Sequence, residues 1–278
     1  MKYKEFELIL SSFKCDKNCP YCTAKITRWP VIDDKLDTLE EKLNYLKNEG
    51  IIFRYFILCG NGEPSLTSLD NFKKIVDSTR KVNIFDEKRL QSSGNIFYED
   101  EKLDYIKNDF IVEITRVDFD SKKDMKVLGY KRDYIESDNF SKANVRLNYV
   151  MLKNKSFNEY LEEIKKYIDK YPNIKTVSLK TLNLNTKDGN IENRYSKWIL
   201  DNALTKADAD NIINCMRNNA NFVTKDMKFF DRYEWIYNGV PVTFYAKKLD
   251  YGYSNIVYYG GRLVDYHLDD IILKKEKE

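Results

Sequence analysis

Three cysteines within eight residues constrain this chain more than any other feature. They are Cys15, Cys19 and Cys22, spaced C-x3-C-x2-C, and they follow an apolar stretch that predicts a first β-strand over residues 6–13. Thiolates are ligands for soft metal centres, and a closed zinc or iron–sulfur site takes four ligands. Three thiolates therefore predict a metal centre with one open position, at which a small molecule can bind.

Two other interpretations of these cysteines compete with an open metal centre. The first is a zinc site that is completed by a distant ligand such as Cys59 or His267. The second is a disulfide framework, which an odd count of five cysteines and the lack of an apolar signal segment after Met1 disfavour. We therefore expect a reducing, cytoplasmic environment. The spacing alone leaves zinc open.

A second motif, Gly-Asn-Gly-Glu-Pro at residues 60–64, follows the apolar run 51–58, which predicts a buried parallel strand. Its glycines allow a tight turn with bare peptide groups, and Glu63 adds an acceptor for a cationic partner. Together with the cysteine run, this segment resembles the radical S-adenosylmethionine (SAM) superfamily. Tyr21 fits that family's C-x3-C-x-aromatic-C pattern, and residues 60–64 resemble its Gly-Gly-Glu-Pro motif with Asn61 inserted. The second motif favours this resemblance over zinc.

The resemblance implies a cofactor arrangement and names the residues that form it. Cys15, Cys19 and Cys22 would hold one [4Fe-4S] cluster, whose fourth iron chelates SAM, and an external donor such as flavodoxin or ferredoxin would supply the electron. The turn formed by Gly60, Asn61, Gly62, Glu63 and Pro64 would bind the amino group of SAM. Residues 90–95 resemble a Thr-Asn-Gly segment, with Ser93 where asparagine is usual. The further implied contacts to SAM are Tyr21, Ser92, Ser93, Gly94, Glu113, Thr115, Arg116 and Asn148.

Alternation along two predicted strands marks additional polar positions. Arg146 and Asn148 alternate with apolar neighbours on one strand, and Ser178 and Lys180 do so on the next. These four side chains are expected to share the barrel-facing side of the sheet, where they contact SAM or substrate or fill a polar interior.

Strand-like and helix-like segments alternate over residues 1–200, a pattern typical of a parallel sheet with crossover helices. The predicted strands are 6–13, 51–58, 89–93, 110–117, 143–151 and 175–180. They match the partial (β/α)6 barrel of the resembled family, with the site at the carboxyl ends of the strands. Residues 201–278 are predicted as a second module, a helix and a small antiparallel meander that covers the substrate. Its two hairpin turns are expected at Asn238-Gly239 and Gly260-Gly261.

Composition limits the partners. The chain has 47 basic and 44 acidic side chains and a net charge of +3, which disfavours a dedicated nucleic-acid-binding protein. It contains no run of 18 apolar residues that would predict a membrane span.

After Cys59 only Cys215 follows, so the cysteines predict a single cluster. Cys59 and Cys215 are interpreted first as packing residues.

The predicted function is that of a single-cluster radical SAM enzyme. The resemblance implies that a 5′-deoxyadenosyl radical abstracts a hydrogen atom from a peptide or small-metabolite substrate, while the reaction outcome stays open. One alternative is an activating enzyme for a glycyl-radical enzyme. An alternative of another class is a metal-binding interaction protein.

Overall fold

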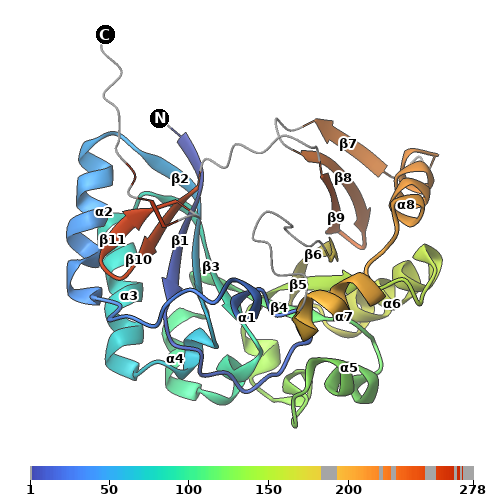
Figure 1. The fold of residues 1–278 in the computed structure, drawn as a ribbon, viewed down its shortest axis with the longest axis horizontal. Helices are drawn as coiled ribbons and strands as arrows, with labels where there is room; N and C mark the ends of the chain where they lie inside the picture. The colour runs from blue at the N-terminus through green and yellow to red at the C-terminus, as the bar shows by residue number, and fades with distance from the viewer. Residues whose placement is uncertain are drawn as a thin grey trace.

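One curved sheet forms the centre of the molecule (Figure 1). The computed structural model describes residues 2–182, 193–218, 222–226, 230–247, 255–265, 268–269 and 271, and His267 lies outside these ranges. Within them the strand order is β11-β10-β1-β2-β3-β4-β5-β6-β9-β8-β7. The central strands are parallel and follow chain order: β1 (Lys2–Leu10), β2 (Ile52–Gly60), β3 (Phe85–Ser92), β4 (Phe110–Arg116), β5 (Asn144–Met151) and β6 (Ile174–Thr181).

Helices connect the consecutive parallel strands and lie on the outer side of the sheet (Figure 1). Their ends carry the expected caps: the Ser68 side chain accepts a hydrogen bond from Asn71 N, and Ser156 forms a capping box with Glu159. The predicted α/β fold with a six-stranded parallel centre is confirmed. The helices on the outer side are α2 (Leu39–Asn48), α3 (Leu69–Val82), α4 (Asp100–Ile106), α5 (Ser121–Leu128) and α6 (Phe157–Lys170), while the short α1 (Thr23–Thr27) lies near α7 (Arg194–Asn202).

Alternation along the strands gives the sheet an apolar outer face and a polar inner face. The outer face packs against the helices through fully buried side chains such as Leu58, Val112 and Leu147. The inner face carries buried polar side chains at the intervening positions: Arg89, Glu113, Arg146 and Ser178. Because burying polar groups costs free energy unless they are paired, this face is where a function is expected.

Strands from the last third of the chain extend the sheet at both edges. Next to β6 lie β9 (Val240–Lys247), β8 (Phe230–Tyr237) and β7 (Phe222–Asp226), while β10 (Ile256–Tyr259) and β11 (Arg262–Val264) lie next to β1. Both predicted hairpin turns are present, with positive φ at Asn238, Gly239, Gly260 and Gly261. The prediction that the two hairpins form one meander is wrong, because each pairs in parallel with a different edge strand of the barrel.

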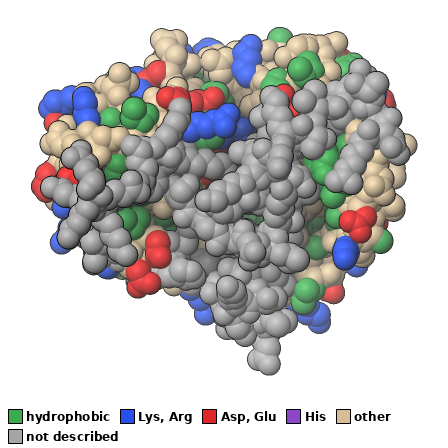
Figure 2. Space-filling model, turned by 90° about the horizontal axis from the view of Figure 1, so that it is seen from above, with side chains coloured by type: hydrophobic (Ala, Val, Ile, Leu, Met, Phe, Trp, Pro, Cys, Tyr) green, Lys and Arg blue, Asp and Glu red, His purple; other side chains and the backbone are tan. Residues whose placement is uncertain are grey.

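In place of the one helix predicted for the second module, the structure has two helices, α7 (Arg194–Asn202) and α8 (Lys206–Asn218). They are separated at Ala203, whose ψ of 150° is extended. No helix in the described ranges is long and apolar enough to cross a membrane. On the face seen in Figure 2, Lys and Arg side chains are interspersed with Asp and Glu, as the balanced composition predicts.

Candidate cofactor site

The cysteine loop begins after β1 and ends where Cys22 precedes the first residue of α1. The peptide N–H of Cys22 donates to the carbonyl of Cys19 at 3.3 Å, which folds the last two cysteines into one turn. Desolvation raises the pKa of Cys15 to about 11, although this residue is exposed, and it raises the pKa of the half-buried Cys19 to about 12. Both thiols are therefore protonated at neutral pH, and a metal must displace these protons to bind.

The three thiols are close enough to influence one another electrostatically, since Cys22 raises the pKa of both Cys15 and Cys19. In the part of the chain that the structure describes, however, no three His, Cys, Asp or Glu side chains converge closely enough to hold a single metal ion.

The glycine motif is attached directly to the cysteine loop. Asn61 N donates to Leu10 O at 2.9 Å, and Glu63 N donates to Lys14 O at 2.8 Å. A Cβ atom at Gly62 would lie 2.2 Å from the carbonyl oxygen of Lys14, so only glycine permits this approach. Two motifs that are some 40 residues apart in the chain thus form one surface at the carboxyl ends of β1 and β2.

Glu63 joins the third predicted segment to this surface. Its carboxylate is 5% exposed and accepts hydrogen bonds from Ser65 N at 3.0 Å, from Ser92 Oγ at 2.9 Å and from Ser93 N. Gly94 has a φ of +106°, and a Cβ atom there would overlap the ring of Tyr134. The ends of β1, β2 and β3, each predicted separately as part of the site, therefore come together.

Glu113 lies in the middle of the inner face, among cations. Its carboxylate lies 3.0 Å from Arg89 Nη1 and 3.3 Å from Arg146 Nε. Gln91 and Asn148 donate to its second oxygen at 3.3 and 3.4 Å. Burial raises the pKa of Glu113, but Arg146, Arg89 and Lys180 outweigh it and hold the pKa below the ordinary value. Because the acceptor positions of its two oxygens are occupied, Glu113 positions the surrounding side chains and has no free acceptor for a direct contact to a ligand.

Within the described ranges, buried polar atoms without a hydrogen-bond partner gather on β5 and β6. They are Arg146 Nε, which has ion-pair distance to Glu113 but no hydrogen-bond geometry, Asn148 Oδ1 and Ser178 Oγ. Asn148 and Ser178 are in register on the two neighbouring strands, with Thr115 next to Asn148 on β4. Native proteins rarely leave such atoms unpaired, and an unseen ligand or water is a common explanation. This patch therefore points toward a bound molecule.

Tyr21, the aromatic residue of the cysteine run, lies beside the loop with its ring 5.7 Å from that of Trp198 on α7. Its hydroxyl is another buried atom without a hydrogen-bond partner. Burial raises its pKa well above the ordinary value, so the hydroxyl stays protonated and available as a donor.

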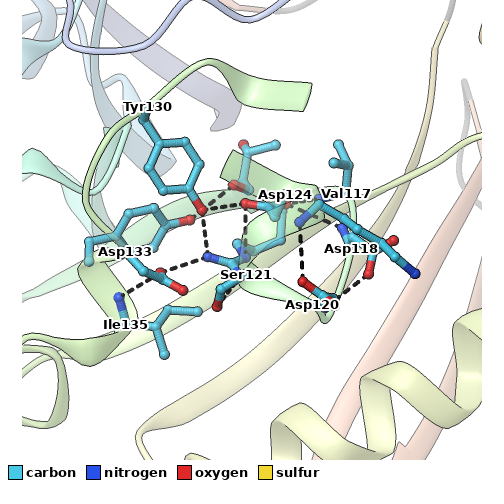
Figure 3. A network of polar contacts seen from close by, with 12 residues as sticks. Val117, Asp118, Asp120, Ser121, Asp124, Tyr130, Asp133 and Ile135 are labelled. Atoms are coloured by element: carbon cyan, nitrogen blue, oxygen red, sulfur yellow. Dashed lines mark hydrogen bonds and ion pairs between the residues drawn. The ribbon is translucent and has the colours of Figure 1, made fainter. Parts of the chain in front are cut away.

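Arg116 is not brought together with Glu113, although the sequence interpretation grouped them. Residues three apart on a strand point to opposite faces, and Arg116 is fully buried on the outer side. Figure 3 shows the polar network in this region, around Asp124, Tyr130 and Asp133. Every guanidinium nitrogen has a partner: the acceptors are Tyr167 Oη, Tyr130 Oη, Asp133 Oδ1 and Ser121 Oγ. Arg116 is therefore committed to the packing on the outer side of the sheet, away from the inner face that carries Glu113.

The remaining cysteines differ in their surroundings. Cys59, on β2, points to the inner face, and burial together with Glu7, Glu113 and Glu5 raises its pKa well above the ordinary value. It thus lies on the polar side of the sheet. This differs from the packing role that the sequence interpretation gave it first. Cys215 on α8 is exposed, which also differs from the predicted packing role.

No protein-family model matches this sequence. No curated protein matches it either.

Solved structures of radical SAM enzymes are similar to the chain in fold. They include SuiB of Streptococcus suis, with a TM-score of 0.49, 16% identity, and coverage of 72% of this chain and 46% of that one. Native anSMEcpe with bound AdoMet and the Cp18Cys peptide has a TM-score of 0.48 and 18% identity, with coverage of 72% of this chain and 59% of that one. HydG of Carboxydothermus hydrogenoformans has a TM-score of 0.45 and 15% identity, over 71% and 51%. The chain thus spans about half the length of the structures it matches.

Proposed function

We propose that this protein is a single-cluster radical SAM enzyme that acts on a peptide or a small metabolite. The observation that carries the proposal is the convergence of the cysteine loop, the glycine motif and the end of β3, linked by Glu63 N to Lys14 O and by Ser93 N to Glu63. A metal centre held by these three thiols alone would have an open position beside this surface. Sites in barrels of this type lie at the carboxyl ends of the strands, where these segments meet.

The residues present fit a [4Fe-4S] cluster. Cys15, Cys19 and Cys22 would each bind one iron, and the fourth iron would be left for SAM. The chemistry that the group supplies when bound is the one-electron cleavage of SAM to a 5′-deoxyadenosyl radical. The electron would come from an external donor such as flavodoxin or ferredoxin. The chain itself contributes the thiols and the enclosing surface.

SAM would bind along the rim formed by the ends of β2 to β5. Glu63 already accepts three hydrogen bonds, so the SAM amino group would take its remaining acceptor position. Asn148 Oδ1 and the Tyr21 hydroxyl are buried and unpartnered, which suits contacts to the bound cofactor. Gly60, Gly62 and Gly94 let the segments of this rim pack closely on Leu10, Lys14 and Tyr134, and Ser92, Ser93 and Thr115 lie on the same rim. Glu113 would act electrostatically, by fixing Arg89 and Arg146.

The role of this chain toward the substrate is orientation and exclusion of water, since a carbon radical reacts with any C–H bond that reaches it. The inner face, with Arg146, Ser178 and Lys180 below and beside the rim, is our candidate for substrate contact. Residues 201–278, proposed as a second module, supply the strands that flank this face on both edges.

Anaerobic reconstitution tests the proposal. The wild-type chain should bind about four irons and four sulfides, the content of one [4Fe-4S] cluster. Cys15→Ala, Cys19→Ala and Cys22→Ala should each abolish it, and Cys215→Ala is the matched control that keeps it. With dithionite and SAM, the reconstituted protein should release 5′-deoxyadenosine. Stoichiometric zinc without iron-dependent absorbance would overturn the proposal.

A further inference from the structure

The three residues between Cys15 and Cys19 each contact a different part of the chain. The Asp16 carboxylate accepts a hydrogen bond from Ser93 Oγ at the end of β3. Asn18 N donates to the carbonyl of Leu128, the last residue of α5, at 3.0 Å. Lys17, between them, is directed into the protein. If a bound metal alone fixed the conformation of this loop, contacts of Asp16, Lys17 and Asn18 with the rest of the chain would not be needed. The contacts therefore point to a second factor that fixes the loop.

Lys17 is buried, with 7% of its surface exposed, and its ammonium group has no hydrogen-bond partner in the described structure. Its Nζ atom lies 4.3 Å from the centre of the Tyr130 ring and 4.5 Å from that of Tyr134. A buried cation without hydrogen bonds is costly, and the electron-rich faces of two aromatic rings offset part of that cost. Burial lowers the pKa of Lys17 from its ordinary value, and the neighbouring Cys19 and Asp124 counteract part of this effect.

Both rings are held firmly by the network of Figure 3 and its neighbours. The Tyr130 hydroxyl donates to Asp124 Oδ2 at 2.5 Å and accepts from Arg116 Nη1 at 2.7 Å. The Tyr134 hydroxyl donates to the carbonyl of Thr115 at 3.1 Å. The two tyrosine rings that contact Lys17 are therefore fixed by hydrogen bonds to β4 and α5 on the outer side of the sheet.

A glycine marks the closest approach of the cysteine loop to this region. Gly129 follows α5 with a φ of +67°, and a Cβ atom there would lie 3.1 Å from the Cβ atom of Asn18. The left-handed conformation and the short distance both favour glycine at this position. The helix end is thus shaped to receive the loop beside Lys17.

We propose that Lys17 is a positioning residue that clamps the cysteine loop onto the Tyr130–Tyr134 pair. The clamp fixes the conformation of the segment between Cys15 and Cys19 before any metal binds. The two thiols are then already positioned to bind separate irons. The consequence for the cluster rests on the proposed function, whereas the preformed loop can be tested in metal-free protein.

Hydrogen exchange in metal-free protein tests the clamp directly. The amide of Asn18, which is bonded to Leu128, should be protected in the wild type. In Lys17→Met, which keeps the length of the side chain and removes its charge, this amide should exchange about tenfold faster, the effect of losing a desolvated cation–π contact. Lys14→Met is the matched control, because it makes the same change at an exposed side chain of the same loop. Amides of β5 and β6 report whether the variants remain folded.

Iron release from reconstituted protein tests the consequence for the cluster. Lys17→Met should lose iron to a chelator about tenfold faster than wild type and Lys14→Met, while Lys17→Arg, which keeps the cation, should lose it more slowly than Lys17→Met. Unchanged exchange at Asn18 in a folded Lys17→Met protein would overturn the clamp. Should the wild type hold no cluster, the proposed function fails, and the exchange result still decides the clamp.

Discussion

Two buried carboxylates on either side of β4 behave in opposite ways. On the inner face, Arg146, Arg89 and Lys180 lower the pKa of Glu113 against the effect of burial. On the outer side, burial raises the pKa of Asp124, although Arg116 Nε lies 3.1 Å away and the Tyr130 hydroxyl donates to it. At the fully enclosed Asp124, the cations Arg116 and Lys17 do not offset desolvation, whereas the three cations around Glu113 do.

The two regions also differ in how completely their polar atoms are paired. In the outer network every guanidinium nitrogen of Arg116 has an acceptor, and among the described residues Asp133 Oδ2 and the Nζ atom of Lys17, which packs on Tyr130 and Tyr134, are buried there without a hydrogen-bond partner. On the inner face three unpaired atoms lie together, on Arg146, Asn148 and Ser178. Paired polar groups stabilise the fold, and unpaired ones are available to a ligand. The comparison therefore contrasts Arg116, whose nitrogens all have protein acceptors, with the unpaired atoms on β5 and β6 of the inner face.

The largest expected effect is on stability, at Arg116. Arg116→Met should lower the free energy of unfolding of the metal-free protein by about 3–5 kcal/mol, because it leaves Asp124 and Asp133 buried without their cation. Urea denaturation measures this loss. Ser178→Ala is the inner-face counterpart, and it should change the stability by less than about 1 kcal/mol because its hydroxyl has no partner to lose. Equal losses in both variants would remove the distinction between the regions.

The next effect is on SAM binding, at the rim. Glu63→Gln keeps the shape of the side chain and removes its charge, so SAM affinity should fall about tenfold or more, in line with a hydrogen bond to a charged group of about 1.5–3 kcal/mol. Iron content should stay at the wild-type level, because no cysteine is changed. Calorimetry on the reconstituted variant measures the affinity. An unchanged affinity contradicts the role of Glu63.

The sequence predicted those parts of the site that depend on local order, and it missed those that depend on distant partners. The spacing of the cysteines and of residues 60–64 predicted two adjacent strand ends, which the contact of Glu63 N with Lys14 O bears out. Strict alternation already separates Glu113 from Arg116, a signal that the grouping by strand end overlooked. No pattern in the sequence marked Lys17, because the two rings that it contacts, Tyr130 and Tyr134, lie more than 100 residues further along the chain. The parallel pairing of β9 and β10 likewise depends on contacts outside the hairpin sequences.

A smaller effect follows from the depressed pKa of Glu113. A carboxyl group whose pKa is lower in the folded chain stabilises the fold above its unfolded pKa, about 4.3, and loses that contribution as the pH falls through the folded pKa. The stability difference between wild type and Glu113→Gln should therefore be constant from pH 8 to 6 and shrink below about pH 4.3. Urea midpoints across this range measure it. A difference that grows on acidification would mean that Glu113 is held protonated, as burial favours for Asp124.

The smallest effect distinguishes the inner face from the surface through cysteine reactivity. The thiolate is the reactive form, and burial beside Glu7 and Glu113 disfavours it at Cys59, whereas Cys215 is exposed. In metal-free protein at pH 8, iodoacetamide should modify Cys215 about tenfold or more faster than Cys59, as followed by peptide mass spectrometry. Glu7→Gln should narrow this gap slightly by removing one of the negative charges near Cys59. Equal rates in the folded wild type would show that the inner face at β2 is open to solvent, and the polar side chains around Glu113 would then be hydrated surface groups and not a site reserved for a ligand.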